Sequence, residues 1–315
     1  MLKCLKRIYP KCLITYVTEE KNKDILKGSR CVDCVIGIGT ADRKSLSRFL
    51  ALGNRLRLQR KVDLFVNLQP SLKTICFGLA MIPKSVWNFK KDRSIQSSTG
   101  RVRHAIDDFI NTIPKAVRLA TFDRNMDFQV SQEDNASVIS KLRDIGLTTE
   151  RLVVINPAGT RDINRWPPLK FAELIRWLVQ QPQSMQVVLI GAPSDHALEK
   201  EVIELAGFNV PSLVGSLQLG ELAGLLRAAT VVLTGDTGPL HLAEAVGAKI
   251  VCLSGAADPN RTGPSNNWQD IVVIQSDLSC VPCQGRTCKR GDIACMNEMD
   301  VSRVADAITR RMRSL

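Results

Sequence analysis

Residues 231–247, VVLTGDTGPLHLAEAVG, combine an apolar run with a turn of small and polar residues. The pattern predicts a strand, a turn at Asp236 and Thr237 that binds a phosphate-sized anion, and then a helix. Gly238 lets the backbone approach a ligand closely because it has no Cβ, and the free N–H groups and positive dipole end of the helix attract negative charge. His241, one turn into the helix, can point a donor at the same anion. A turn of this kind also serves helix capping alone, without a ligand.

A second segment of the same kind lies upstream, in residues 152–179. It contains the apolar run LVVIN, the polar loop PAGTRDINRWPP and an amphipathic helical pattern. The loop carries the small and cationic groups that a diphosphate needs, namely Gly159, Thr160, Arg161 and Arg165. Two anion-binding turns in one α/β domain indicate one bound phosphate ester at the carboxyl edge of a parallel sheet.

A carboxylate follows the strand that we expect at residues 186–190. Asp195 lies where a carboxylate holds ribose hydroxyls in dinucleotide-binding folds. Its alternative role is that of N-cap for the helix expected at residues 197–205. Asp236 has the same two interpretations, and its place beside Gly238 and His241 favours ligand contact.

Together these segments resemble glycosyltransferase family 9, the heptosyltransferase group that builds the inner core of bacterial lipopolysaccharide. The resemblance covers nearly all of residues 150–300 in order and spacing, and it extends more weakly into the first half. Its carriers are NPAGTRDINRWPPLKFAELI, VVLIGAPSD, LVGSLQLGELAGLLRAATVVLTGDTGPLHLAEAVGA and CVPCQGRTCKRGDIACM. Such enzymes have the GT-B architecture, in which two doubly wound Rossmann-like α/β domains face a cleft, and this is the fold class that we expect.

The resemblance implies inverting transfer of a heptose from ADP-heptose, or a related nucleotide sugar, to a hydroxyl of the lipopolysaccharide core, with no separate cofactor and no metal. The departing diphosphate needs helix N-termini and cations already in place, so Thr160 would donate a hydroxyl and Arg165 would supply charge. Family members often carry lysine where this chain has Asn164, so Arg165 or Arg161 takes over the phosphate pairing. The acceptor hydroxyl needs a base, and the sequence identifies no catalytic residue for that role.

The chain has 315 residues, more than one ordinary core needs. Alternating strands and helices predict parallel sheets with crossover helices. We expect an acceptor-side Rossmann-like domain at residues 1–148 and a donor-binding domain at 149–315, whose last helix, 301–312, crosses back to the first domain in the resembled fold.

The chain lacks an apolar run near the ~18 residues of a membrane-spanning helix and the features of a signal peptide. We therefore expect a cytoplasmic protein.

The periodicity locates the expected elements of both halves. The first half is predicted to contain strands at 13–18, 32–36 and 63–67 and helices at 44–59, 71–80, 101–113 and 133–145. The second half is predicted to contain strands at 152–156, 186–190, 212–214, 230–233, 249–253 and 271–274, with helices between them.

The chain opens on a predicted helix, residues 2–9, where a doubly wound domain opens on a strand. In related enzymes that strand ends in a Gly-Asp turn whose carboxylate is proposed to be the catalytic base, and no residue here aligns with it. The N-terminal domain is then incomplete, and the two neighbours of the absent strand lose a partner. Either the translation start is assigned too late or the chain is a truncated, inactive copy. We favour the first, in which the codons upstream of Met1 continue in frame.

The positive charge is concentrated in the first half. Residues 1–150 contain 27 Lys and Arg against 15 Asp and Glu, whereas residues 151–315 contain 16 of each. A basic surface suits an anionic acceptor such as the lipopolysaccharide core, with its phosphates and acidic sugars, at the inner face of the inner membrane. The alternative is that these charges only solvate the protein surface and bind no partner. Aromatic residues make up 5% of the chain, and this scarcity argues against a nucleic-acid partner.

Ten cysteines in a chain without an export signal indicate reduced thiols. Cys280, Cys283, Cys288 and Cys295 have the spacing C-x2-C-x4-C-x6-C, which is typical of a tetrahedral zinc site. The spacing recurs in relatives whose transfer reaction needs no metal. We therefore expect free or redox-sensitive thiols, with a structural metal as the alternative.

Two further classes of function stay open. A sugar-nucleotide epimerase or hydrolase can share the two-domain architecture and the diphosphate loops, and it would turn over the donor without an acceptor. A catalytically inactive homologue would bind nucleotide sugar and release no nucleotide product, even with the acceptor present.

Overall fold

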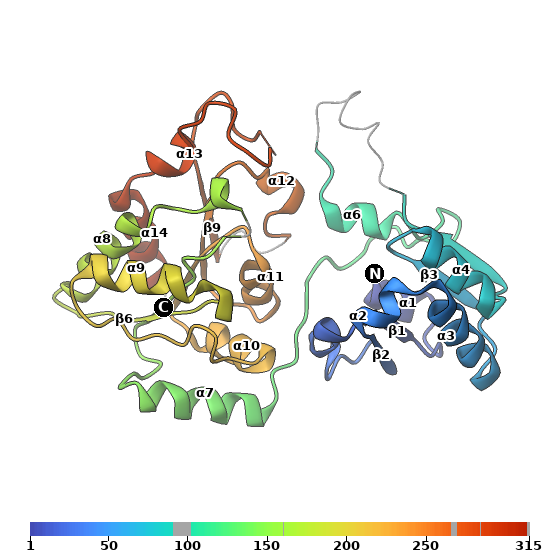
Figure 1. Cartoon of the computed structure of the whole chain (residues 1–315). Helices are drawn as coiled ribbons and strands as arrows, with labels where there is room; N and C mark the ends of the chain where they lie inside the picture. The colour runs from blue at the N-terminus through green and yellow to red at the C-terminus, as the bar shows by residue number, and fades with distance from the viewer. Residues whose placement is uncertain (91–101, 160, 266–269, 284, 314–315) are drawn as a thin grey trace. The chain divides into compact units, whose positions relative to one another are not determined.

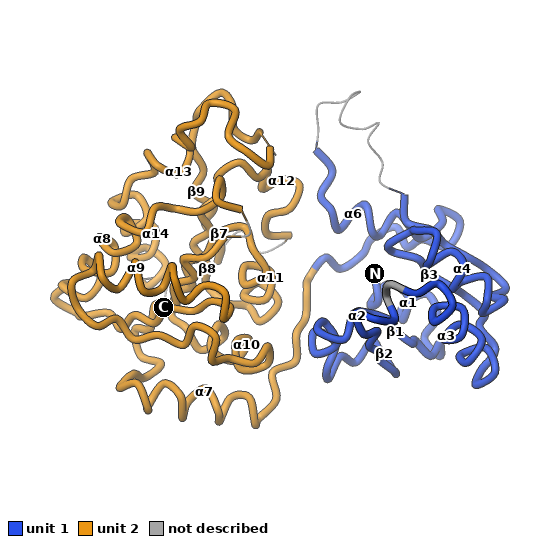
Figure 2. Tube along the Cα trace, in the orientation of Figure 1, with its two compact units in different colours: residues 1–124 blue, residues 125–315 orange. Residues whose placement is uncertain are grey.

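The computed structural model describes residues 1–90, 102–159, 161–265, 270–283 and 285–313. The chain divides into two compact units, Met1–Arg124 (unit 1) and Asn125–Leu315 (unit 2), which Figure 2 shows in separate colours. This division comes earlier in the chain than the expected boundary between residues 148 and 149. Helix α7 (Gln132–Asp144) therefore belongs to unit 2, where it packs against α10 (Leu219–Ala228).

A polar contact holds α7 on unit 2. Lys141 Nζ lies 2.7 Å from Glu221 Oε2, and Ser137 Oγ donates to the other carboxylate oxygen at 2.5 Å. Burial raises the pKa of Glu221, but hydrogen bonds from Lys141, Ser137 and the Gln218 backbone outweigh it and leave the pKa below its ordinary value. Glu221 thus stays ionised and anchors α7.

Unit 2 is built on a parallel sheet with the strand order β6-β5-β7-β8-β9. Its strands are β5 (Leu152–Ile155), β6 (Gln186–Leu189), β7 (Val231–Gly235), β8 (Ile250–Ser254) and β9 (Ile271–Gln275). Along β5, Val153 and Ile155 enter one hydrophobic core, and Leu152 and Val154 enter a second one. This alternation of apolar residues to both faces is what a parallel sheet covered on both sides requires.

Helices cover the two faces of this sheet (Figure 1). One core is closed by α8 (Pro168–Val179), α9 (His196–Ala206) and α14 (Val301–Arg313), and the other by α7, α10 and α11 (Gly238–Ala245). Shorter elements are the 3₁₀ turns η2 (Asp162–Asn164) and η3 (Pro193–Asp195) and the helices α12 (Pro259–Thr262) and α13 (Ala294–Asn297). Helix α14, for which we expected a crossing to the first domain, packs against α8, β7 and β8 of its own unit.

Unit 1 has smaller sheets. Its described strands form two separate parallel pairs, β1–β2 and β3–β4, in place of one continuous sheet. The strands are β1 (Thr15–Glu19), β2 (Cys34–Ile38), β3 (Leu64–Asn67) and β4 (Ser85–Asn88). The helical elements are α1 (Leu2–Ile8), η1 (Glu20–Leu26), α2 (Thr40–Lys44), α3 (Leu46–Gln59), α4 (Leu72–Met81) and α6 (Ala105–Ile110). None of the helices described in either unit has the length and apolar character needed to cross a membrane.

Helices α3 and α4 pack closely beside β3. Phe77 of α4 contacts Phe49 and Phe65 edge-on, at centroid separations of 5.9 and 5.8 Å. A Cβ added to Gly53 of α3 would lie 2.8 Å from the Ala80 Cβ of α4. The absence of a side chain at Gly53 therefore lets the two helices approach closely.

Two expected elements differ in the structure, and one strand was not expected. The strand predicted at 212–214 is a single bridge between Leu189 and Ser212, because Pro211 has no N–H to extend the ladder and the chain turns at Leu213. Strand β4 was not predicted. The helix expected from residue 101 begins at Ala105, where His104 Nδ1 accepts the Ile106 N–H as a cap, and residue 101 lies outside the described residues.

Trp166 anchors the loop between β5 and α8 in the core of unit 2. It is 1% exposed, meets Phe171 edge-on at 5.0 Å, and donates from Nε1 to the Met299 carbonyl at 3.1 Å. Lys170 Nζ donates to the same carbonyl at 2.8 Å. The side chain thus joins the loop to the segment before α14.

Replacing Trp166 tests this anchoring. We expect Trp166→Ala to lower the free energy of unfolding by about 3–5 kcal/mol, because it leaves a large cavity. Trp166→Phe should cost only about 1–2 kcal/mol, since Lys170 still satisfies the Met299 carbonyl. Urea unfolding followed by circular dichroism measures both, and equal losses for the two variants would contradict the assigned packing.

Candidate functional site

The strand order of unit 2 has a switch point between β5 and β7. The chain leaves β5 toward α8 on one face of the sheet and leaves β7 toward α11 on the opposite face. Ligands of open α/β sheets bind in the crevice outside the carboxyl ends of the two strands at such a point. Both anion-binding loops expected from the sequence begin here.

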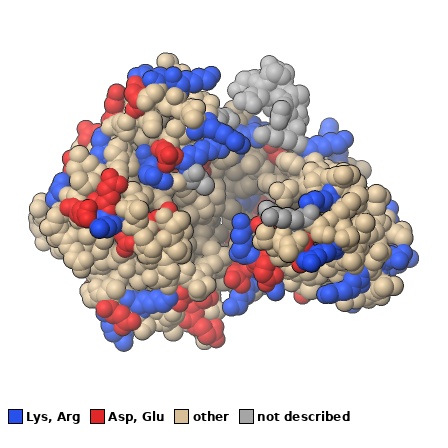
Figure 3. Space-filling view, viewed as in Figure 1, with Lys and Arg blue, Asp and Glu red and all other residues tan. Residues whose placement is uncertain are grey.

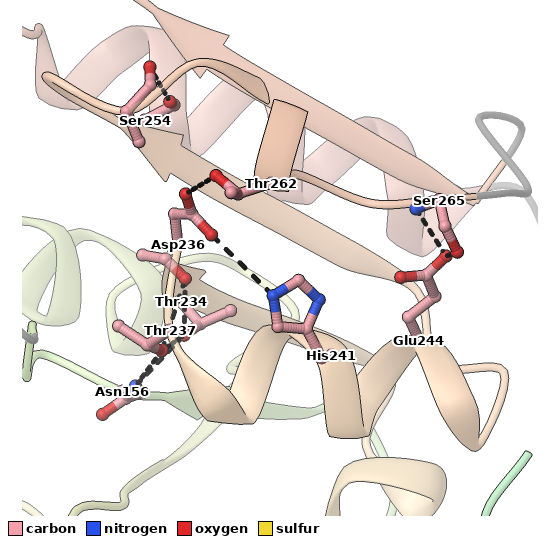
Figure 4. A network of polar contacts seen from close by, with 11 residues as sticks. Asn156, Thr234, Asp236, Thr237, His241, Glu244, Ser254, Thr262 and Ser265 are labelled. Atoms are coloured by element: carbon pink, nitrogen blue, oxygen red, sulfur yellow. Dashed lines mark hydrogen bonds and ion pairs between the residues drawn. The ribbon is translucent and has the colours of Figure 1, made fainter. Parts of the chain in front are cut away.

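Asn156, the first residue after β5, connects these two loops (Figure 4). Its Nδ2 donates to Thr234 Oγ1 at 3.1 Å and to Thr237 Oγ1 at 3.3 Å, while its Oδ1 accepts the Ala158 N–H at 3.3 Å. Asn156 and Thr234 are buried, and a buried amide is stable only when its hydrogen bonds are satisfied. The two loops therefore lie side by side, as a shared diphosphate site requires.

Helix α11 begins directly beside this contact. Thr237 is its N-cap, but the Thr237 hydroxyl makes no capping bond to the helix and contacts Thr234 and Asn156. Gly238 is exposed, and a Cβ added there would meet no described heavy atom within 4 Å. The helix start thus offers backbone N–H groups and open space to an anion.

Asp236 and His241 face each other across the same turn (Figure 4). Asp236 Oδ2 accepts from Thr262 Oγ1 of α12 at 2.9 Å, and Oδ1 lies 4.0 Å from His241 Nε2. Thr237 takes the N-cap position of α11, so the interpretation of Asp236 as a simple cap is wrong. The His241 side chain is 41% exposed and remains open to a ligand.

The 159–165 loop contains the two expected arginines. Arg165 forms an ion pair with Asp162 at 3.3 Å, and its buried Nε has no hydrogen-bond partner within the described part of the chain. Arg161 Nη1 instead donates to the Gly285 carbonyl at 3.1 Å, in the segment that carries the cysteines. Thr160 lies outside the described residues. Arg165 Nη2 also donates to the Gly159 carbonyl at 3.5 Å, so the Arg165 guanidinium lies along the loop itself, whereas Arg161 reaches a distant segment.

Asn164 has a role that sequence reasoning missed. It is 9% exposed, and its Oδ1 accepts the Ala256 N–H at 3.0 Å, which ties the 159–165 loop to the loop after β8. A lysine at this position could not accept that bond. Asn156, Thr234 and Thr262 were missed as well; the signal for the first was its position directly after a buried strand.

Asp195 makes a contact within its own loop. Its Oδ2 accepts the Ala192 N–H at 2.7 Å, which closes the η3 turn after β6. Although Asp195 is the N-cap residue of α9, its side chain makes no capping bond to that helix. Its predicted capping role is therefore wrong in detail, and the ribose contact stays a prediction.

The four spaced cysteines of unit 2 differ in environment. Cys280 and Cys283 are exposed, and Cys295 is buried. The Ile293 backbone N–H, together with those of Arg290 and Gly291, lowers the pKa of Cys288 below its ordinary value. Across the described ranges, no three His, Cys, Asp or Glu side chains form a group that could hold a metal ion. Backbone donors therefore make Cys288 easier to ionise than an ordinary thiol. The free-thiol interpretation of the four cysteines and its structural-metal alternative both stay predictions.

The chain matches one family model, that of glycosyltransferase family 9 (heptosyltransferase), over residues 49–294. It is 21% identical over 286 residues to the lipopolysaccharide core heptosyltransferase OpsX of Haemophilus influenzae, which covers 87% of this chain and 79% of that protein. It is 31% identical over 154 residues to lipopolysaccharide heptosyltransferase 2 of Salmonella typhimurium, covering 46% of this chain and 42% of that protein.

Two solved structures share the fold. The family 9 glycosyl transferase of Veillonella parvula has a TM-score of 0.84 at 21% identity, covering 100% of this chain and 92% of that one. The ADP-heptose lipopolysaccharide heptosyltransferase II of Escherichia coli has a TM-score of 0.75 at 19% identity, covering 99% and 93%. These likenesses confirm the expected GT-B fold class of two Rossmann-like α/β parts. Since the family model spans most of its length, the chain belongs to glycosyltransferase family 9.

Proposed function

We propose that the protein transfers a heptose from ADP-heptose, or a related nucleotide sugar, to the inner core of lipopolysaccharide, with inversion at the anomeric carbon. Family membership supports glycosyl transfer, and the names of the relatives supply the sugar and the acceptor class. A solved E. coli heptosyltransferase with ADP, at TM-score 0.66 and 19% identity, supports the nucleotide. The observation that carries the proposal is the junction of the two loops at Asn156.

In this proposal the donor diphosphate lies between the 159–165 loop and the start of α11. As the sugar leaves, negative charge grows on the diphosphate, and donors fixed beforehand stabilise it most. The N–H groups at Gly238, the Arg165 guanidinium and the His241 ring would supply those donors, with the predicted Thr160 hydroxyl beside them. Arg161 is engaged by the Gly285 carbonyl, so its part is the positioning of the loop. Asp195 would hold the ribose from the neighbouring loop.

Unit 1 is proposed to receive the acceptor. Residues 1–124 contain 25 Lys and Arg against 10 Asp and Glu, whereas residues 125–315 contain 18 against 21. A positively charged surface attracts and orients an acceptor that carries phosphates and acidic sugars. The acceptor would meet its donor at a membrane surface, where lipopolysaccharide is assembled. No catalytic base is assigned to any residue of the chain.

An acceptor-dependence assay tests the proposed reaction. With ADP-heptose and a lipopolysaccharide core that lacks heptose, we expect ADP release that rises with acceptor concentration. Release at the same rate without acceptor would contradict the proposal and favour a hydrolase. Binding of ADP-heptose without any release would favour an inactive homologue.

Substitution of Arg165 tests the charge at the diphosphate. We expect Arg165→Ala to weaken ADP binding about tenfold, or ~1.4 kcal/mol, because one cation is lost. Isothermal titration calorimetry measures this. The control is Arg227→Ala, on the exposed side of α10, where the side chain contacts only Asn135 among the contacts described. An unchanged dissociation constant for Arg165→Ala removes Arg165 from the site.

Substitution of Gly238 separates ligand contact from folding. A Cβ at this position meets open space in the protein, so Gly238→Ala should leave thermal stability unchanged or slightly raised. If the diphosphate lies against this glycine, the same methyl group should weaken ADP binding about tenfold. Full ADP affinity in a stable Gly238→Ala protein would place the diphosphate elsewhere.

A further inference from the structure

Three helices of unit 2 begin with the same local contact. Before α12, α13 and α14, an aspartate carboxylate accepts the backbone N–H two positions further along the chain. These bonds run to Asp258 from Asn260 at 3.0 Å, to Asp292 from Ala294 at 3.2 Å and to Asp300 from Ser302 at 3.0 Å. An aspartate makes this bond readily, because its short side chain lies close to the N–H groups that a helix start leaves unpaired.

Asp236 precedes α11 with the same spacing to Gly238 but makes a different contact. Its Oδ2 accepts from the Thr262 hydroxyl at 2.9 Å, and its Oδ1 lies 4.0 Å from His241 Nε2 (Figure 4). A Cβ added to Gly238 would meet no described heavy atom within 4 Å, so the space around this glycine is open. The Asp236 carboxylate is thus turned toward Thr262 and His241.

The Gly238 N–H is the donor that this orientation affects. Pro239, the next residue, has no N–H, and the Leu240 N–H is bonded to the Thr237 carbonyl at 3.1 Å. An anion at the start of α11 therefore binds through the Gly238 N–H, which is also the group that an aspartate at position 236 could accept from, as at the other three helices.

Thr262 is held in place by its own segment. Its N–H donates to the carbonyl of Asp258, a residue that is 4% exposed, at 3.0 Å. Beyond α12, the Ser265 N–H and hydroxyl donate to Glu244 Oε1 at 2.8 and 2.7 Å, near the end of α11. The segment is thus joined to α11 near both ends of that helix, which fixes the Thr262 hydroxyl opposite Asp236.

A carboxylate bonded to the Gly238 N–H would compete with a diphosphate. Both groups are anions, so they repel each other and use the same donor. Unit 2 has no overall excess of positive charge to offset this repulsion. Residues 125–315 contain 18 Lys and Arg against 21 Asp and Glu, and Figure 3 shows both signs mixed on the visible face of unit 2. The orientation of this one carboxylate therefore matters for anion binding.

We propose that Thr262 is a positioning residue for donor binding: its hydroxyl holds the Asp236 carboxylate away from the Gly238 N–H and so keeps that N–H for the diphosphate. Thr262 acts through Asp236 and needs no contact with the donor itself. The inference rests on the proposed function, in which the donor diphosphate lies at the start of α11. It gives the segment after β8 a part in donor affinity.

Two substitutions of Thr262 test the inference by isothermal titration calorimetry with ADP. Thr262→Val keeps the shape of the side chain and removes its hydroxyl, so Asp236 can accept the Gly238 N–H, and ADP binding should weaken about tenfold. Thr262→Ser keeps the hydroxyl and should bind ADP as the wild type does. The thermal midpoint of Thr262→Val should not fall, because the released carboxylate gains a bond at the helix start.

The variant Asp236→Ala decides whether Thr262 acts through Asp236. In this background Thr262→Val should cause no further loss of ADP affinity, since no carboxylate is left to compete. Three results would overturn the inference and leave the proposed function standing. They are wild-type ADP affinity in Thr262→Val, equal losses in the Val and Ser variants, and an undiminished loss from Thr262→Val in the Asp236→Ala background. A wild-type protein that binds no ADP would overturn the proposed function as well.

Discussion

The buried amide of Asn156 is the constraint on which the donor region depends. Parallel pairing sets Ile155 opposite Leu233, so Asn156, the residue after Ile155, lies beside Thr234. A polar group at this depth is costly unless its hydrogen bonds are made, and they are made only when the loop after β5 and the turn after β7 lie together. The polar side chain therefore fixes the relative position of two loops that are far apart in the sequence.

The strand order of the sheet in unit 2 determines what lies around the Asn156 contact. Because β5 and β7 send their helices to opposite faces, the chain segments diverge beyond the Asn156 contact, and Gly238 at the start of α11 is exposed. Asn164 and Thr262 extend the arrangement to the loop after β8 and to α12. Further along α11, Glu244 accepts from the backbone and hydroxyl of Ser265, which holds the helix in place (Figure 4). Because these contacts already order the loops, a ligand that binds there does not have to supply the free energy of ordering them.

Local patterns in the sequence predicted local structure well. The strand, turn and helix around Asp236 and the loop before Trp166 follow from spacing that one segment contains. Contacts between distant segments were not predictable in this way: Asn164 with Ala256, Arg161 with Gly285 and Thr262 with Asp236 each depend on which strands become neighbours. The same limit explains the packing of α14 against α8, β7 and β8, because that packing depends on partners that periodicity does not reveal. The two separate strand pairs of unit 1, in contrast, agree with the expectation that two strands of this half lack a shared neighbour.

In the proposed function, the loops at residues 157–165 and 236–241 are two halves of one diphosphate site. Hydrogen–deuterium exchange of the protein with and without ADP tests this most directly. We predict that ADP slows backbone exchange in both loops together and leaves α7 unchanged. Protection of only one loop, or protection confined to other segments while ADP is bound, would contradict the account.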